Sequence, residues 1–423
     1  MGTVFSLLAG WLIDGSGSPA ADNMLIRIED GIISSLDHVP SGPATGSSAP
    51  GCADLSNCTI IPSLVDSHVH LTLSGSIDQA LRHDQLHYTF DRNAPLIAGR
   101  VARYLSFGIL ALRDGGDRSG DSLRYNLERM AYGMGFSAHS PSANPKSRDK
   151  RPTWPAQDAP IHLKTPGSAW RANGRYGSMI GNPPEPGLTL AQSILLRTDP
   201  IDHVKIINSG LNSLTEFGKQ TPPQFSREEI QAAVKAARQH GLKTMVHANG
   251  TAPVADALEA GCSSIEHGFF MGRENMLRMA DLQTFWVPTA YSMKALRENT
   301  PSTAIESRTA ARNLDQQLDQ ISRARSLGVR IALGTDAGGF GLHHAESFIE
   351  EFKLFKTAGF STEEAVRCSS MEGALLLGLD AEMGSIRVGM PATFVVLNGH
   401  PSLLPDSLHN VRTVYVRGET VHA

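Results

Sequence analysis

Residues 60–70 read IIPSLVDSHVH, an apolar run that ends in two histidines with one residue between them. Short apolar runs of this kind are typical of strands that are covered on both faces in a parallel sheet. Side chains at positions i and i+2 of a strand point to the same side, so His68 and His70 can approach one point. The pair alone is weak evidence, because 16 histidines in 423 residues give about 0.6 such pairs by chance.

Four further apolar runs carry a residue with metal-binding chemistry at or near their end. A lone histidine there is more often structural, and an aspartate in GTDAG more often caps a turn. In a (β/α)8 barrel, however, the C-terminal ends of the strands converge on the face that holds the active site. The set in this order therefore predicts a hydrolytic metal site. The runs are DHVKIINSG, LKTMVHANG, CSSIEHG and VRIALGTDAG, and their residues are Lys205, His247, His267 and Asp336.

Strand and helix patterns alternate between residues 60 and 384, which predicts an α/β fold with a parallel sheet, a TIM-type (β/α)8 barrel. A capping box at Ser226–Glu229 starts the clearest helix, which ends at Gly241. Longer helices are expected over about 303–327 and 361–377. Eight strands are expected at 60–66, 108–114, 160–164, 203–208, 242–248, 263–268, 284–288 and 329–336.

The two ends of the chain share a different pattern. Alternating apolar and polar residues surround a turn at Asp30-Gly31, and a similar texture follows residue 394 with a turn near Gly418. Residues 1–59 and 385–423 are therefore predicted to form one small β-sandwich domain beside the barrel. Residues 133–187 are rich in Pro, Ser, Gly and Asn, and are predicted to be an irregular loop insertion in the barrel.

Composition excludes several classes of function. A net charge of -4 gives no reason to expect a nucleic-acid partner. The apolar run VFSLLAGWLI near the N-terminus is too short to span a bilayer and lacks a preceding basic region, so we expect no membrane partner and no signal peptide. The four cysteines form no CxxC pair, which favours a reduced, cytoplasmic setting.

The chain resembles the amidohydrolase superfamily, most of all its prolidase-like and imidazolonepropionase-like metal-dependent hydrolases. The resemblance rests on the runs above together with AGWLIDGSG, GILALRDGGD, GSIRVGMPATFVVL and VYVRGETVHA. It implies a metal at His68, His70, Lys205, His247, His267 and Asp336. The lysine after the fourth strand implies two divalent ions, most often zinc, bridged by N6-carboxylated Lys205. If Lys205 instead forms an ordinary ion pair, the histidines and Asp336 hold one metal.

The resemblance also implies an activity. The leading expectation is hydrolysis of a C–N amide bond in a small molecule, such as a dipeptide, an N-acyl amino acid or a cyclic amide, with Asp336 as proton shuttle. The alternative is a mononuclear deaminase, an imidazolonepropionase-like ring opener or a lactonase. A non-enzymatic relative is disfavoured because all six ligands are present. A homo-oligomer is expected.

Substrate-binding residues are expected in loops at the catalytic face. The candidates are Arg175, Tyr176, Tyr291 and His343, with Arg171 and His344 beside them. The sequence also departs from the usual family pattern after the fifth strand, where Asn249 stands in place of a second histidine.

Overall fold

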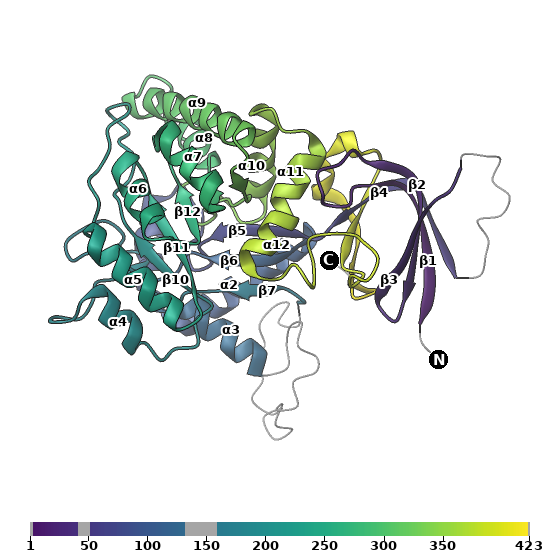
Figure 1. Ribbon diagram of the computed structural model, residues 1–423, viewed down its shortest axis with the longest axis horizontal. Coiled ribbons are helices and arrows are strands. Elements are labelled where there is room, and N and C mark those ends of the chain that lie inside the picture. Colours follow the sequence, from purple (N-terminus) through teal and green to yellow (C-terminus); the bar gives the residue numbers. More distant parts are fainter. Residues whose placement is uncertain (1–2, 41–50, 132–158, 422–423) are drawn as a thin grey trace.

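Eight parallel strands surround the centre of the larger part of the molecule (Figure 1). The computed structural model describes residues 3–40, 51–131 and 159–421. The strands are β5 (Leu64–Val69), β6 (Ile109–Asp114), β7 (His162–Lys164), β10 (His203–Ile207), β11 (Lys243–Ala248), β12 (Ser264–His267), β13 (Phe285–Val287) and β14 (Arg330–Ile331). Two short strands, β8 (Ala169–Trp170) and β9 (Gly181–Asn182), extend the sheet from β10.

The barrel consists of two hydrogen-bonded sheets that meet at two seams. One sheet has the order β5-β6-β7 and the other β14-β13-β12-β11-β10-β8-β9. At the first seam, Asp336 N donates to His68 O at 2.8 Å, beside a parallel bridge between Val69 and Ala337. At the second, Asp202 N donates to Thr165 O at 2.9 Å. The predicted barrel is confirmed, and its first seam lies at two of the proposed ligands.

The last barrel strand is shorter than predicted. Only Arg330–Ile331 form β14, whereas the sequence predicted a strand over 329–336. The backbone of the following residues bonds to several different elements instead of one ladder: Ala332 N donates to Trp286 O, and Leu333 N donates to Cys368 O. From Leu333 onward the chain pairs with β5, where Leu333 O accepts a hydrogen bond from Ser67 N at 2.9 Å.

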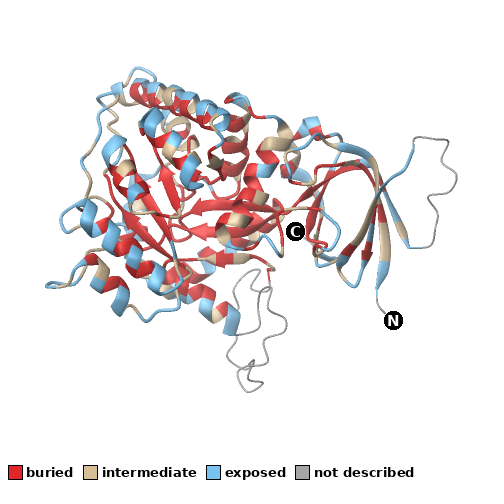
Figure 2. Ribbon diagram, in the orientation of Figure 1, coloured by how far each residue is buried: buried red, intermediate tan, exposed pale blue. Residues whose placement is uncertain are grey.

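Helices cover the outside of the barrel, and their buried faces lie against the buried strands (Figure 2). The capping box at Ser226 is confirmed. The helix predicted over 361–377 is wrong as one element, because Ser370 (φ -132°, ψ -82°) breaks it in two. The helices are α1 (Gln79–Asp84), α2 (Phe90–Ser106), α3 (Asp121–Ala131), α4 (Leu190–Leu196), α5 (Arg227–Gln239), α6 (Thr251–Glu259), α7 (Gly272–Leu282), α8 (Tyr291–Glu298), α9 (Ile305–Ser326), α10 (Glu346–Thr357), α11 (Thr362–Ser369) and α12 (Met371–Leu377), with 3-10 turns η1 (Gln85–His87), η3 (Pro401–Leu403) and η4 (Asp406–Asn410).

Strands from both ends of the chain form the predicted separate β domain, at the right of Figure 1. They belong to one continuous sheet, which packs around a hydrophobic core separate from that of the barrel. An antiparallel bridge joins Ile32 to Pro391. In order across the sheet they are β17 (Glu419–Val421), β16 (Val411–Val416), β15 (Phe394–Asn398), β4 (Cys52–Pro62), β1 (Val4–Leu12), β2 (Ala21–Glu29) and β3 (Ile32–His38). After Ser63, β4 leads directly into the first barrel strand, β5.

Two further sequence predictions concern the rest of the chain. Of the irregular insertion predicted at 133–187, residues 133–158 lie outside the described residues, and the remainder holds the short strands β7, β8 and β9. Among the helices that the structure describes, none has the length and apolar character to cross a membrane.

Candidate metal centre

One cavity of about 230 Å³ gathers all six residues proposed as metal ligands. They come from five strands or strand ends: β5, β10, β11, β12 and the segment after β14. This is the C-terminal face of the barrel, where the strand ends converge. The residues are His68, His70, Lys205, His247, His267 and Asp336.

Three of the six approach each other closely enough to bind one ion. Asp336 Oδ1 lies 3.5 Å from His68 Nε2 and 3.3 Å from His70 Nε2. One ligand atom from each of these residues lies within 4.8 Å of the others. His68 Nε2 is buried and has no hydrogen-bond partner among the described residues. Two imidazoles and a carboxylate are suitable ligands for a divalent cation such as zinc.

The other three residues lie beside this group. The rings of His267 and His68 are 5.0 Å apart, and those of His247 and His267 are 4.6 Å apart. Lys205 is 1% exposed, and its Nζ has no hydrogen-bond partner within the described part of the chain. A buried amine without a partner is costly. Burial lowers the pKa of Lys205 to about 8, despite the opposing effect of Glu266.

Neighbouring groups orient the histidine rings. His68 Nδ1 contacts Glu266 Oε2 at 2.8 Å, His70 Nδ1 contacts Gly116 O at 3.0 Å, and His267 Nδ1 contacts Thr289 Oγ1 at 2.7 Å. When one ring nitrogen is held in this way, the other is left free for a metal. The rings are therefore preorganised as ligands.

Glu266 is a part of the site that the sequence analysis missed. Its Oε1 accepts a hydrogen bond from Arg113 Nη2 at 2.7 Å, while its other oxygen holds His68. Strand alternation would turn Glu266 and His267 to opposite sides, but His267 has φ 66° and both reach the barrel interior. The sequence does carry a signal for this pair, because each of two buried strands contains one charged residue. These are Arg113 in ILALRD and Glu266 in SSIEH, whose charges can pair with each other.

The charge states suit a cation. Burial lowers the pKa of His247 to about 4, and burial together with His247 lowers the pKa of His267 to about 3. Burial opposes ionisation of Asp336, but its hydrogen bond with His70 and the nearby His68 hold the pKa of Asp336 far below its usual range. Neutral imidazoles, as at His247 and His267, and an ionised carboxylate bind metal without first losing protons. Burial lowers the pKa of His70, but its hydrogen bond with Asp336 raises it overall, so His70 would release a proton when it binds a metal.

Backbone packing fixes the position of these ligands. A Cβ on Gly115 would lie 2.4 Å from His70 Cε1, and one on Gly334 would lie 2.8 Å from His68 N. These contacts explain why GILALRDGGD has a glycine at position 115 and why GTDAG begins with a glycine at position 334. Asp66 accepts hydrogen bonds from Thr335 N at 3.0 Å and Thr335 Oγ1 at 2.7 Å, which holds the residue next to Asp336.

The predicted substrate residues divide into two groups. Tyr176 lines the cavity, with its ring 5.5 Å from that of His247. Arg175, Tyr291 and His343 do not line it. Arg175 is exposed and donates to Pro222 O, and the backbone N of Tyr291 donates to Glu351. Of the four predicted substrate residues, the structure therefore places only Tyr176 at the metal centre.

Arg171 and His344, the two further substrate candidates, also lie outside the cavity lining. Arg171 donates to backbone carbonyls of its own loop, among them Gly181 O at 3.2 Å. His344 is buried, and its Nε2 contacts His70 O at 3.2 Å. Asn249 does line the cavity, where its Oδ1 accepts from Phe269 N at 3.1 Å.

The cavity walls are mainly apolar. Apart from Lys205, the one lysine or arginine among the described residues that line it is Arg82 from α1. Sequence patterns do not mark Arg82, because α1 has no buried residues and so no apolar periodicity. The apolar side chains are Leu73, Met179, Ile180, Leu211, Leu214, Phe269, Met293, Leu296, Phe340 and Leu342.

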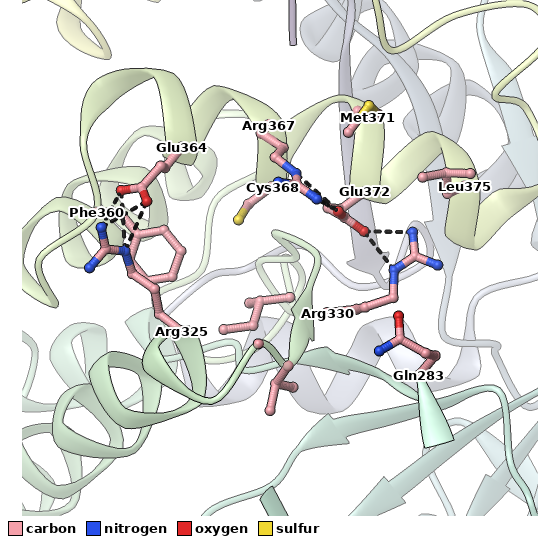
Figure 3. A pocket seen from close by; sticks show the side chains of 13 residues that line it. Gln283, Arg325, Arg330, Phe360, Glu364, Arg367, Cys368, Met371, Glu372 and Leu375 are labelled. Carbon is pink, nitrogen blue, oxygen red and sulfur yellow. Dashed lines mark hydrogen bonds and ion pairs between the residues drawn. The ribbon is translucent and has the colours of Figure 1, made fainter. Parts of the chain in front are cut away.

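A larger cavity, of about 420 Å³, lies at the opposite end of the barrel, where β14 begins. Figure 3 shows Glu372 there, paired with both Arg330 and Arg367, while Arg325 pairs with Glu364. These carboxylates already neutralise most of the positive charge. The N-terminal end of such a barrel contributes stability rather than catalysis.

Two buried glutamates, each paired with arginine, offer a matched test of the metal centre. We expect Glu266→Gln to lower zinc affinity by about 10–100-fold, because it loosens the hold on His68. Glu372→Gln should leave zinc affinity unchanged. Each should lower the free energy of unfolding by about 1–3 kcal/mol, because arginines lose their counter-charge. Zinc titration and urea unfolding measure both effects. Equal zinc affinity in the two variants would contradict the role assigned to Glu266.

Comparison with known proteins agrees with this architecture. Residues 59–421 match the model of the amidohydrolase family, and the chain belongs to that family. An ochratoxinase from Aspergillus niger is 28% identical over 181 residues, which cover 42% of this chain and 37% of that protein. An imidazolonepropionase from Sphingopyxis alaskensis is 29% identical over 187 residues, covering 43% and 41%. The chain thus aligns with about two fifths of the length of these relatives.

Solved structures match over the whole chain. A Xaa-Pro dipeptidase with methionine bound in its active site is 25% identical, with a TM-score of 0.74 and complete coverage of both chains. The Aspergillus niger ochratoxinase structure has a TM-score of 0.74 at 18% identity, covering 99% of this chain and 95% of that one, and its likeness is one of fold alone. The structural neighbours are prolidase-like amidohydrolases.

Proposed function

We propose that the protein is a metal-dependent hydrolase that cleaves a C–N amide bond in a small molecule. The observation that carries the proposal is the convergence of six residues with metal-binding chemistry in one cavity at the C-terminal face of the barrel. Membership of the amidohydrolase family supports it. The dipeptidase among the similar structures favours an amide bond as the one that is cleaved.

We further propose that the centre holds two divalent ions, zinc first among them, with Lys205 carboxylated on Nζ. His68, His70 and Asp336 would hold one ion, and His247 and His267 the other. A lysine carbamate would offer two oxygens that share one negative charge as metal ligands, whereas an ammonium has no lone pair to offer. The ions would supply Lewis acidity and lower the pKa of water toward about 7.

The protein groups then have separate tasks. Asp336, whose Oδ1 lies 3.5 Å from His68 Nε2 and 3.3 Å from His70 Nε2, is the group placed to accept a proton from the attacking water. It can then pass that proton to the leaving nitrogen. The apolar walls exclude bulk water, which strengthens each electrostatic contact inside the cavity. Tyr176 stands beside His247, where it can contact a bound substrate.

A second candidate function is ring opening or deamination with one metal. The close group of three ligands, His68, His70 and Asp336, is enough for one ion. The imidazolonepropionases among the relatives favour the same alternative. In that case Lys205 carries no carboxyl group and acts as an ordinary cation.

The two candidates predict different substrates. The zinc-reconstituted protein should be tested against N-acyl amino acids, dipeptides, hydantoins, lactones and imidazolonepropionate. We expect hydrolysis of linear or cyclic amides, lost on treatment with a chelator and regained with zinc. Turnover confined to imidazolonepropionate or lactones would favour the second candidate. Amide hydrolysis that persists without any metal would contradict both.

A further inference from the structure

Arg82 is held in a fixed position at the metal cavity. Its Nη1 donates to two backbone carbonyls, Ser76 O and Gly338 O, each at 3.2 Å. The first belongs to the loop before α1, and the second lies two residues after Asp336. Both hydrogens of Nη1 are therefore used to connect the helix to the loop that carries the proposed proton shuttle. An arginine anchored in this way loses little further side-chain entropy when it binds a ligand.

The other edge of the same guanidinium is free. Among the described residues, Nε and Nη2 of Arg82 have no hydrogen-bond partner. These two atoms carry parallel N–H bonds, which match the two oxygens of a carboxylate. Arg82 also shows no ion pair with an acidic side chain of the described chain, unlike the arginines of the opposite cavity. Arg82 lines the same cavity as Asp336 and Tyr176.

The surroundings make this free edge selective. Arg82 and the six proposed ligands line one cavity of about 230 Å³, so a single small molecule can contact both. The remaining walls are largely apolar, and none of the described residues in them is acidic. A substrate without negative charge would cover the free N–H groups and leave them without acceptors. Buried donors left unpaired in this way are penalised more heavily than a formed hydrogen bond is rewarded.

We propose that Arg82 is a specificity-determining residue that binds a carboxylate of the substrate. The substrate class is then an amide with a free carboxylate on one side of the cleaved bond and an apolar group against the walls. This inference rests on the proposed amide hydrolysis. The carboxylate pairs with Nε and Nη2 while the amide carbonyl reaches the metal ligands, and apolar side chains such as Met293 and Leu296 receive the rest.

Two substrates that differ only in the carboxylate test the inference: N-acetyl-L-leucine and N-(3-methylbutyl)acetamide. We expect the zinc-loaded wild type to favour the acid in kcat/KM by about 30-fold or more, the effect of a desolvated charge pair. Arg82→Met should remove this preference, by raising KM for the acid and by raising kcat/KM for the neutral amide, which no longer leaves N–H groups unpaired. Arg82→Lys keeps the charge without the paired N–H groups and should fall between the two. Arg175→Met, at an exposed arginine outside the cavity, is the matched control and should behave as wild type.

A binding measurement separates this inference from the proposed function. Calorimetry with N-acetyl-L-leucine should use Asp336→Asn, with and without Arg82→Met, so that turnover does not interfere. A Kd that rises about 30-fold on loss of Arg82 supports carboxylate binding even if neither amide is hydrolysed, and that failure would count against the proposed function alone. Hydrolysis by wild type with an unchanged acid preference in both Arg82 variants would overturn the inference and leave the function standing. An unchanged Kd would also overturn it.

Discussion

Asp336→Asn should lower kcat by about 10²–10⁴-fold while KM changes little, the range expected for a general acid–base group. The amide oxygen of asparagine can still approach a metal beside His68 and His70, but it cannot accept a proton. In the wild type, the contact with His70 keeps this carboxylate ionised against the effect of burial, with its pKa far below the usual range. The measurement is steady-state kinetics on protein of known metal content.

The metal content of Asp336→Asn shows whether activity is lost with the proton shuttle or with the metal ion. A fall in kcat beyond this range, together with reduced zinc, would show that Asp336 mainly holds the ion. Near-normal kcat with full zinc would contradict the shuttle role. The structure then offers Tyr176 as the next group to test, because it lines the cavity. His343 is exposed and outside the lining, and His344 already contacts His70 O.

Lys205→Ala should lower activity by about 10³-fold or more, because a bound metal contributes several kcal/mol to catalysis and each 1.4 kcal/mol is a factor of ten. The physical reason is the position of Nζ, buried and without a partner beside the histidines. Burial also lowers the pKa of Lys205 to about 8, so more of the neutral amine that reacts with carbon dioxide is present at neutral pH. Kinetics and elemental analysis should show both the lost activity and a lost ion.

Chemical rescue and mass measurement complete this test. Formate, acetate or propionate should restore part of the activity of Lys205→Ala by supplying the missing carboxylate. Lys219→Ala, at an exposed lysine paired with Glu216, is the matched control and should keep full activity. Unmodified Lys205 in fully active enzyme, seen by intact-mass measurement under gentle conditions, would contradict the carbamate.

The sequence predicted the convergence of the six ligands because each stands at or near the C-terminal end of a buried strand, and the barrel topology brings such ends together. It did not predict what surrounds them. Arg82 lies on a short exposed helix without a periodic pattern. His267 has a positive φ, so strand alternation does not predict that Glu266 and His267 both lie inside the barrel. Tyr291 and His343 were chosen from their place in loops, and loop position does not determine where a side chain points.

Local hydrogen bonding differs from the expectation in the last barrel strand. Apolar residues 332–333 favoured a longer last strand, but their amides bond to Trp286 O and Cys368 O. The break at Ser370 lies within a sequence that suits one helix. The boundaries at residues 59 and 385, the homo-oligomeric state and the cytoplasmic location stay predictions.

The number of metal ions that full activity requires tests the central claim most directly. Metal-free protein should be titrated with zinc while bound metal and amide hydrolysis are followed together. We expect activity on an N-acyl amino acid to rise to a plateau at about two ions per chain, shared among His68, His70, Lys205, His247, His267 and Asp336. Full activity at one ion per chain, with no second ion bound, would contradict the binuclear centre.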